Sequence, residues 1–166
     1  MKKSLILSAL AFGLAIIVLA GCNFSVGTKK DFNTGLKVSY NGFAIDNAYL
    51  VNAAGKPLNT NKIPLDSGFA IQVTGVENYT LKNGKAYPGC ELQIWDNTGK
   101  SLGTAPDLMA DIAKNGLEPR VATVLSATLT LHEPFKRGQT YRIAARFFDK
   151  ENKKNEIKTD VNVVLK

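Results

Sequence analysis

Residues 138–165 have the sequence GQTYRIAARFFDKENKKNEIKTDVNVVL, in which two alternating apolar segments flank a run rich in lysine and asparagine. Alternation of apolar and polar residues is typical of a β-strand with one buried face. We therefore predict a hairpin of two strands, near residues 140–149 and 156–165, joined by the lysine-rich turn. The residues expected to face the core are Tyr141, Ile143, Ala145, Phe147, Ile157, Thr159, Val161, Val163 and Leu165.

The same alternation recurs on the N-terminal side of this hairpin. It is found at residues 36–40, 69–73, 90–94 and 125–131. Turn residues separate these segments, and Asn83-Gly84 is the strongest hairpin signal because both residue types tolerate positive φ. Many short strands at this spacing favour an antiparallel sandwich or barrel.

One segment breaks the alternation. Between Thr104 and Gly116, Leu108 and Ile112 stand four residues apart. Thr104 is a suitable N-terminal cap, and Gly116 is a suitable C-terminal one. The spacing predicts one short helix in a connection between strands.

The approach to the C-terminal hairpin resembles part of an immunoglobulin-like domain. The run Gly138-Gln139-Thr140-Tyr141, followed by alternation, resembles the entry to strand F of that family. The resemblance implies that the Tyr141 hydroxyl bonds to nearby backbone, and Ile143 excludes the disulfide-bearing type. Trp95 lies off the core-facing positions of its strand. The expected fold class is all-β: an immunoglobulin-like antiparallel β-sandwich over residues 36–166, with one short helix in a connection.

The N-terminus has the three parts of a secretory signal. Lys2 and Lys3 precede an uncharged, mostly apolar run, which ends in Leu19-Ala20-Gly21-Cys22. This tetrapeptide resembles the bacterial lipobox at every position. The resemblance implies that a diacylglycerol is attached to Cys22 and that a peptidase cuts after Gly21. An uncut transmembrane anchor is the alternative, although the apolar run is shorter than the roughly 20 residues that span a bilayer.

A lipid on Cys22 implies a protein held at the cell membrane without a spanning helix, because two or more acyl chains give stable anchoring. Residues 1–21 are then the signal peptide. Residues 22–35 are predicted to be a lipidated flexible tether, since they lack periodicity and are rich in Gly, Asn, Ser and Thr. Asn23 rather than aspartate follows the cysteine, which in lipoprotein sorting favours the outer membrane where the cell has one.

Basic residues are concentrated near the C-terminus. Loss of the two signal-peptide lysines leaves 19 of the 21 basic residues against 14 acidic ones, and residues 134–158 hold eight basic and three acidic residues. Anionic head groups or acidic glycans are the expected partners of such a segment at an envelope, and nucleic acid is not. The candidate basic surface is Arg142, Arg146 and Lys158. The interpretation that we favour, however, is a solvated hairpin that keeps the domain soluble.

Three aromatic residues surround the predicted Asn83-Gly84 turn: Tyr79, Tyr87 and Trp95. If they are exposed together, they form a candidate ligand surface for stacking sugars or binding a protein. If they are buried, they belong to the core.

The sequence offers few groups for catalysis or metal binding. His132 is the only histidine, and Cys22 and Cys90 are the only cysteines. No Gly-x-Ser-x-Gly elbow and no phosphate-binding glycine loop is present. We therefore predict no catalytic residue, no metal and no cofactor. Cys90 is expected to be a small buried hydrophobe, because it alternates with apolar residues.

These observations favour a membrane-anchored lipoprotein that acts as a non-enzymatic binding or interaction module at the cell envelope. An envelope protein or glycan is the expected kind of partner, and the sequence names neither the ligand nor the oligomeric state. The alternative is a hydrolase of envelope glycans, which needs two carboxyl groups in one cleft. No feature of the sequence pairs two such groups.

Overall fold

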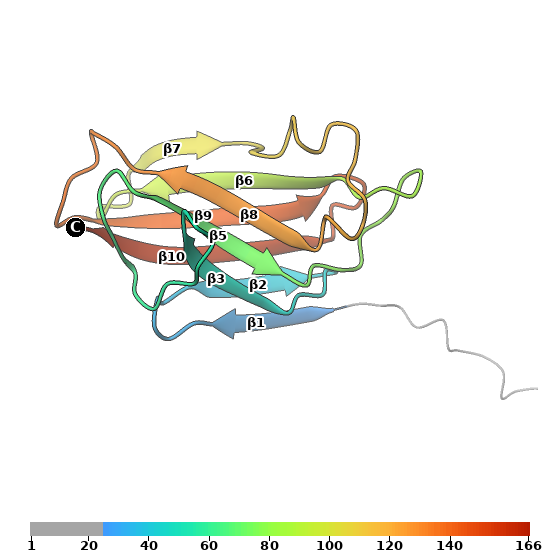
Figure 1. Cartoon of the computed structure of the whole chain (residues 1–166), viewed down its shortest axis with the longest axis horizontal. Helices are drawn as coiled ribbons and strands as arrows, with labels where there is room; N and C mark the ends of the chain where they lie inside the picture. Colours follow the sequence, from blue (N-terminus) through green and yellow to red (C-terminus); the bar gives the residue numbers. More distant parts are fainter. Residues whose placement is uncertain (1–24) are drawn as a thin grey trace, which may run out of the picture.

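The computed structural model describes residues 25–166, which form two sheets packed face to face (Figure 1). The larger sheet has seven strands in the order β1-β2-β10-β9-β6-β7, with β4 beside one end of β10, and the smaller sheet has the order β3-β5-β8. Pairing is antiparallel except between β4 and β10. The strands are β1 (Val26–Lys30), β2 (Lys37–Asn41), β3 (Asn47–Asn52), β4 (Lys62–Ile63), β5 (Gly68–Thr74), β6 (Pro88–Trp95), β7 (Ser101–Ala105), β8 (Val124–Thr130), β9 (Thr140–Asp149) and β10 (Glu156–Leu165).

The predicted all-β, sandwich-like architecture is confirmed, and the C-terminal hairpin is its centre. Strands β9 and β10 have the predicted bounds and pair in antiparallel register. All nine predicted core positions of the hairpin are buried. They pack against the inward side chains of the smaller sheet, such as Phe69, Ile71 and Leu125.

Local features of the predicted sandwich are also confirmed. The backbone N–H of Lys136 donates to the Tyr141 hydroxyl at 2.9 Å, so this tyrosine returns to nearby backbone as expected. Asn83 and Gly84 both have positive φ, at 52° and 75°, as a tight hairpin turn requires. Trp95 is half-buried on the outward side of β6 rather than in the core.

The predicted helix over residues 104–116 is wrong, because within residues 25–166 this range holds the end of β7 followed by turns. The Asp107 carboxylate accepts hydrogen bonds from the backbone of Cys90 at 3.0 Å and of Met109 at 2.9 Å. It also forms an ion pair with Lys150 at 2.7 Å. These contacts fix the segment against β6 and β9, and Ile112 is left 71% exposed.

The predicted flexible tether is wrong for residues 26–30, which form strand β1 at the edge of the larger sheet. Gly27 lies against the Tyr40 ring, where a Cβ would clash, and the Lys29 ammonium reaches the backbone carbonyls of Ile45 and Asp46. Asp31 and the buried Thr34 then close a turn into β2, with 2.5 Å between the Thr34 hydroxyl and the carboxylate.

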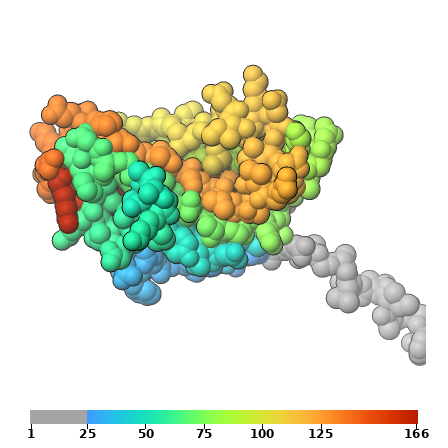
Figure 2. Space-filling model, viewed as in Figure 1, coloured from blue at the N-terminus to red at the C-terminus, as the bar shows by residue number. Residues whose placement is uncertain are grey.

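Cys22 and the predicted signal peptide lie outside the described residues. Within residues 25–166, no helix has the length and apolar character needed to cross a bilayer. Strand β1 lies at the lower edge of the molecule in Figures 1 and 2, and the C-terminus lies at one end of the sandwich.

Candidate functional site

The outward side of the larger sheet, here called the outer face, carries the predicted basic surface. Every second side chain of β2, β6, β9 and β10 points to this face, and the residues between them point to the core. The register of the strands aligns the outward side chains in rows across the sheet. Arg142, Arg146 and Lys158 all lie on this face, so the structure brings the three predicted residues together. One row contains Lys30, Lys37, Asp160, Ala144 and Gln93, and the next contains Thr28, Ser39, Lys158, Arg146 and Glu91.

Carboxylates engage each of these three predicted basic residues. Arg142 donates to Asp160 at 2.5 Å, and Arg146 donates to Glu156 at 2.8 Å. Lys158 forms an ion pair with Glu156 at 2.6 Å. The predicted basic surface is therefore a mixed-charge network, and its attraction for an external anion is reduced.

Glu156 is the acidic centre of this network. Partial burial opposes ionisation of its carboxyl, but hydrogen bonds from Arg146 and Lys158 outweigh that effect and lower its pKa below the ordinary value. Arg146 also lies 3.6 Å from Glu91, so it joins acidic residues of two strands. Glu156 is consequently ionised at neutral pH and holds the two cations in place.

Aromatic rings support both arginines. The Arg142 guanidinium lies 4.8 Å from the Trp95 ring centroid, and that of Arg146 lies 4.8 Å from the Phe148 ring centroid. A guanidinium held between a ring and a carboxylate has few rotamers to lose when a ligand binds. The outer face therefore presents preorganised polar groups.

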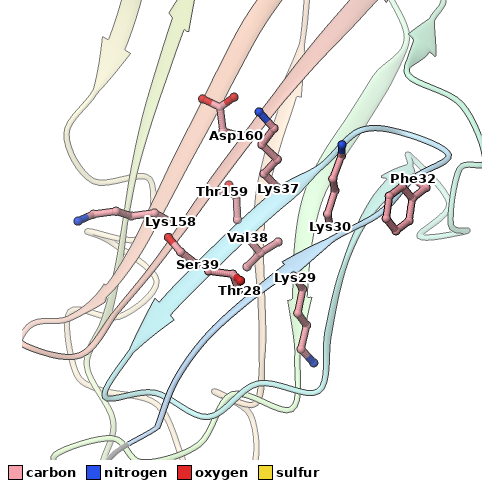
Figure 3. Close-up of a pocket in the computed structure, with 10 residues that line it drawn as sticks. All are labelled: Thr28, Lys29, Lys30, Phe32, Lys37, Val38, Ser39, Lys158, Thr159 and Asp160. Carbon is pink, nitrogen blue, oxygen red and sulfur yellow. The ribbon is translucent and has the colours of Figure 1, made fainter.

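Two hollows share this face. The first, the lysine hollow, has a volume of about 570 Å³ and lies over β1, β2 and β10 (Figure 3). The second, the arginine hollow, has a volume of about 390 Å³, and the small side chain of Ala144 lies on its floor. Lys158 and Asp160 line both, so the two hollows adjoin. The arginine hollow is also lined by Glu91, Gln93, Trp95, Arg142, Ala145 and Arg146.

The lysine hollow is lined by side chains of three neighbouring strands. Lys30 is directly opposite Lys37, and Thr28 is directly opposite Ser39. Figure 3 shows the two hydroxyl residues between Lys158 and Lys30, with Phe32 beside Lys30. The surface is therefore rich in hydrogen-bond donors. Asp160 is the one carboxylate among its lining residues, and Arg142 already binds it.

The three predicted aromatic residues do not form one surface. The Tyr79 hydroxyl donates to the Ala122 carbonyl at 3.0 Å, and its ring packs edge-on against Phe43 at 4.8 Å. Burial, with a contribution from Asp149, raises the pKa of Tyr79. Tyr87 and Trp95 lie at opposite ends of β6, about 26 Å apart along an extended strand. Of the three, Trp95 alone lines the arginine hollow.

The groups with catalytic chemistry are scattered. His132 pairs with Asp66 at 2.8 Å, and both side chains are exposed. Within residues 25–166, no group of three or more His, Cys, Asp or Glu side chains is placed to hold a metal ion. Cys90 is fully buried, and burial, helped by Asp107 and Glu91, raises its thiol pKa to about 12.

Cys90 is consequently expected to be inert in the folded protein. At pH 8 its thiol stays protonated and out of contact with solvent, so a thiol reagent such as Ellman's should react only after unfolding. The described domain should also unfold at the same temperature with and without reductant. Rapid labelling of Cys90 under native conditions would contradict this burial.

Comparisons with known proteins find only distant similarity. No protein-family model matches the chain, and no curated protein matches it in sequence. One similar solved structure is a superoxide reductase (neelaredoxin) from Ignicoccus hospitalis. It is 15% identical, and the match covers 64% of this chain and 74% of that chain with a TM-score of 0.34. Similarity this low supports no conclusion about the activity of this chain.

Sequence analysis missed several residues of the outer face. Lys30 was placed in the tether, so its position opposite Lys37 was not foreseen. Glu91 and Asp160 stand on different strands from the arginines that they engage, and strand order and register bring each pair together. The alternation of apolar and polar residues along β6 and β10 could have indicated these residues. It places the carboxylates of Glu91 and Asp160 on the outward side of the sheet, where the arginines also lie.

Proposed function

We propose that the protein is a lipid-anchored, non-enzymatic binding module of the cell envelope, and that the arginine hollow of the outer face is its ligand surface. The lipobox supports the anchor at Cys22, and an outer-membrane location follows from Asn23 where the cell has an outer membrane. The hydrogen-bonded Tyr141 supports an immunoglobulin-like relationship for the sandwich. The ligand class that we propose is an envelope protein or glycan.

The observation that carries the proposal is the arginine hollow of the outer face. Its two arginines are held by ion pairs and ring contacts before any ligand arrives. Preorganisation of this kind raises affinity because little conformational freedom is lost on binding. A small residue, Ala144, lies at the centre and leaves room for a ligand group.

A glycan hydrolase is supported less well by this geometry. Glu91 and Asp160 line the arginine hollow together, but they stand on β6 and β10 with β9 between them. Each carboxylate is engaged by an arginine, at 3.6 Å for Glu91 and 2.5 Å for Asp160. Glycoside cleavage places two carboxyl groups against the scissile bond, whereas here each one is already in contact with an arginine.

Filling the arginine hollow tests the proposed ligand surface. Ala144→Trp should abolish capture of the partner when the lipidated protein is used as bait in detergent extracts of its own membranes. Thr128→Trp is the matched control, because Thr128 is exposed on the outward side of the smaller sheet. Capture of the same partner by wild type and both variants would refute the outer face as the ligand surface.

A further inference from the structure

The edge of the larger sheet at β1 combines positive charge with exposed apolar groups. Val26 is 62% exposed and Phe32 is 87% exposed, and both flank the cationic part of this strand. The Lys30 ammonium lies 5.3 Å from the Phe32 ring centroid. Aromatic rings beside lysines are typical of protein segments that lie at the level of lipid head groups.

The lysine pair within this edge has one carboxylate beside it, that of Asp160 opposite Lys37, and this carboxylate is already bound by Arg142. Like charges directly opposite one another on neighbouring strands destabilise a sheet. Among residues 25–166, no carboxylate forms an ion pair with Lys30 or Lys37, whereas each arginine of the arginine hollow has one. Thr28 and Ser39 add hydroxyl donors in the next row. Ammonium and hydroxyl groups arranged together suit the oxygens of a phosphate.

Chain length restricts what β1 can face. Val26 is the fourth residue after Cys22, so the two Cα atoms are at most about 14 Å apart. If Cys22 carries the lipid, as the proposed function requires, the start of β1 lies within that distance of the lipidated residue, and Lys30 lies at most about 13 Å further along the strand. Chain length thus keeps the β1 edge close to the membrane surface.

We propose that the β1 edge faces the membrane and that the lysine hollow binds the phosphates of anionic phospholipid head groups. Phe32 and Val26 then enter the interfacial region on either side of the lysines. The sandwich is held in one orientation by the lipid and the edge together. This inference rests on the proposed lipid anchor and adds the surface through which the domain contacts the bilayer.

Vesicle sedimentation tests the inference with the lipid removed. All ten strands and the core lie within residues 25–166, so the chain from residue 22 with Cys22→Ser is a suitable sample. It should sediment with vesicles of phosphatidylcholine and phosphatidylglycerol more than with phosphatidylcholine alone. Binding should weaken between ~0.1 M and ~1 M salt, because the Debye length falls from about 10 Å to about 3 Å.

Replacing the lysine pair locates the contact. Lys30→Ala with Lys37→Ala should weaken binding to the anionic vesicles about 30-fold, which is about fivefold for each lysine. Both side chains are exposed, so the fold should be kept, and near-ultraviolet circular dichroism checks this. Lys136→Ala with Arg137→Ala is the control, since it removes the same charge from an exposed loop between β8 and β9.

We expect the Lys30→Ala, Lys37→Ala variant to lose most of its binding to anionic vesicles. The Lys136→Ala, Arg137→Ala control should lose only a little of this binding. Equal sedimentation with both vesicle types, or an equal loss from both double variants, overturns the inference. If either result occurs while Ala144→Trp still abolishes partner capture, the proposed function stands and only the membrane-facing edge is wrong.

Discussion

Phe147→Ala is expected to lower the free energy of unfolding by about 3–5 kcal/mol, the usual cost of truncating a buried phenylalanine. Phe147 is fully buried at the centre of the larger sheet, between Cys90 of β6 and Ile157 of β10. Its neighbours stand on fixed strands and can close the resulting cavity only in part. For a domain of this size the midpoint of thermal unfolding should fall by about 10–20 °C.

The adjacent residue provides the control for this prediction. Phe148 points to the outer face, where its ring lies 4.8 Å from the Arg146 guanidinium. Phe148→Ala should lower the free energy of unfolding by only about 1–2 kcal/mol, because its half-buried ring loses contacts with the Arg146 guanidinium and Gly89 but leaves no cavity in the core. Urea denaturation of the two variants measures the difference. Equal losses would contradict the predicted alternation of β9 between core and outer face.

That alternation is the part of the fold that could be predicted from sequence. Tyr141, Ile143 and Phe147 alternate with polar neighbours, and period-two patterning is a local property of the chain. The hairpin bounds followed from it directly. The Asn83-Gly84 turn was predictable for a similar reason, since the positive φ it requires depends on the two residues alone.

Strand β1 and the segment after β7 depend on distant contacts, and local patterns could not predict them. Gly27 and Lys29 have no apolar alternation, yet a partner strand and the carbonyls of Ile45 and Asp46 order them. Leu108 and Ile112 have helical spacing, but the neighbouring Asp107 binds the backbone of β6 and the Lys150 ammonium, and these contacts hold the segment in turns. In both cases long-range hydrogen bonds outweigh the weak local preference.

The candidate site was predictable in part for the same reason. Alternation placed Arg142, Arg146 and Lys158 on one face, as the structure has them. Their ion pairs with Glu91, Glu156 and Asp160 depend on strand order and register, which the sequence did not specify. The dispersed positions of Tyr79, Tyr87 and Trp95 likewise follow from the topology of β6 and its surroundings.

Cys22→Ser is expected to release the protein from the membrane fraction or to leave an uncut precursor. Each buried methylene of an acyl chain contributes about 0.8 kcal/mol, so loss of two or more chains removes nearly all of the anchoring free energy. Weak binding through the β1 edge alone should not survive high-salt washing. Fractionation of cells into membrane and soluble secreted fractions measures the effect.

Cys90→Ala is the matched control for this substitution. It removes the other cysteine of the chain from a buried position and leaves Cys22 in place. This variant should remain in the membrane fraction, with at most a modest loss of stability from the smaller side chain. Release of both variants to the same extent would show that membrane attachment does not depend on Cys22.

Mass spectrometry of the N-terminal peptide, on protein purified from its own membranes, is the decisive test of the lipid anchor. We expect residues 1–21 to be absent and the first residue to be Cys22 with a mass increase equal to a diacylglyceryl group, with or without a further acyl chain. An intact Met1 terminus with an unmodified Cys22 would show that the protein is not a lipoprotein.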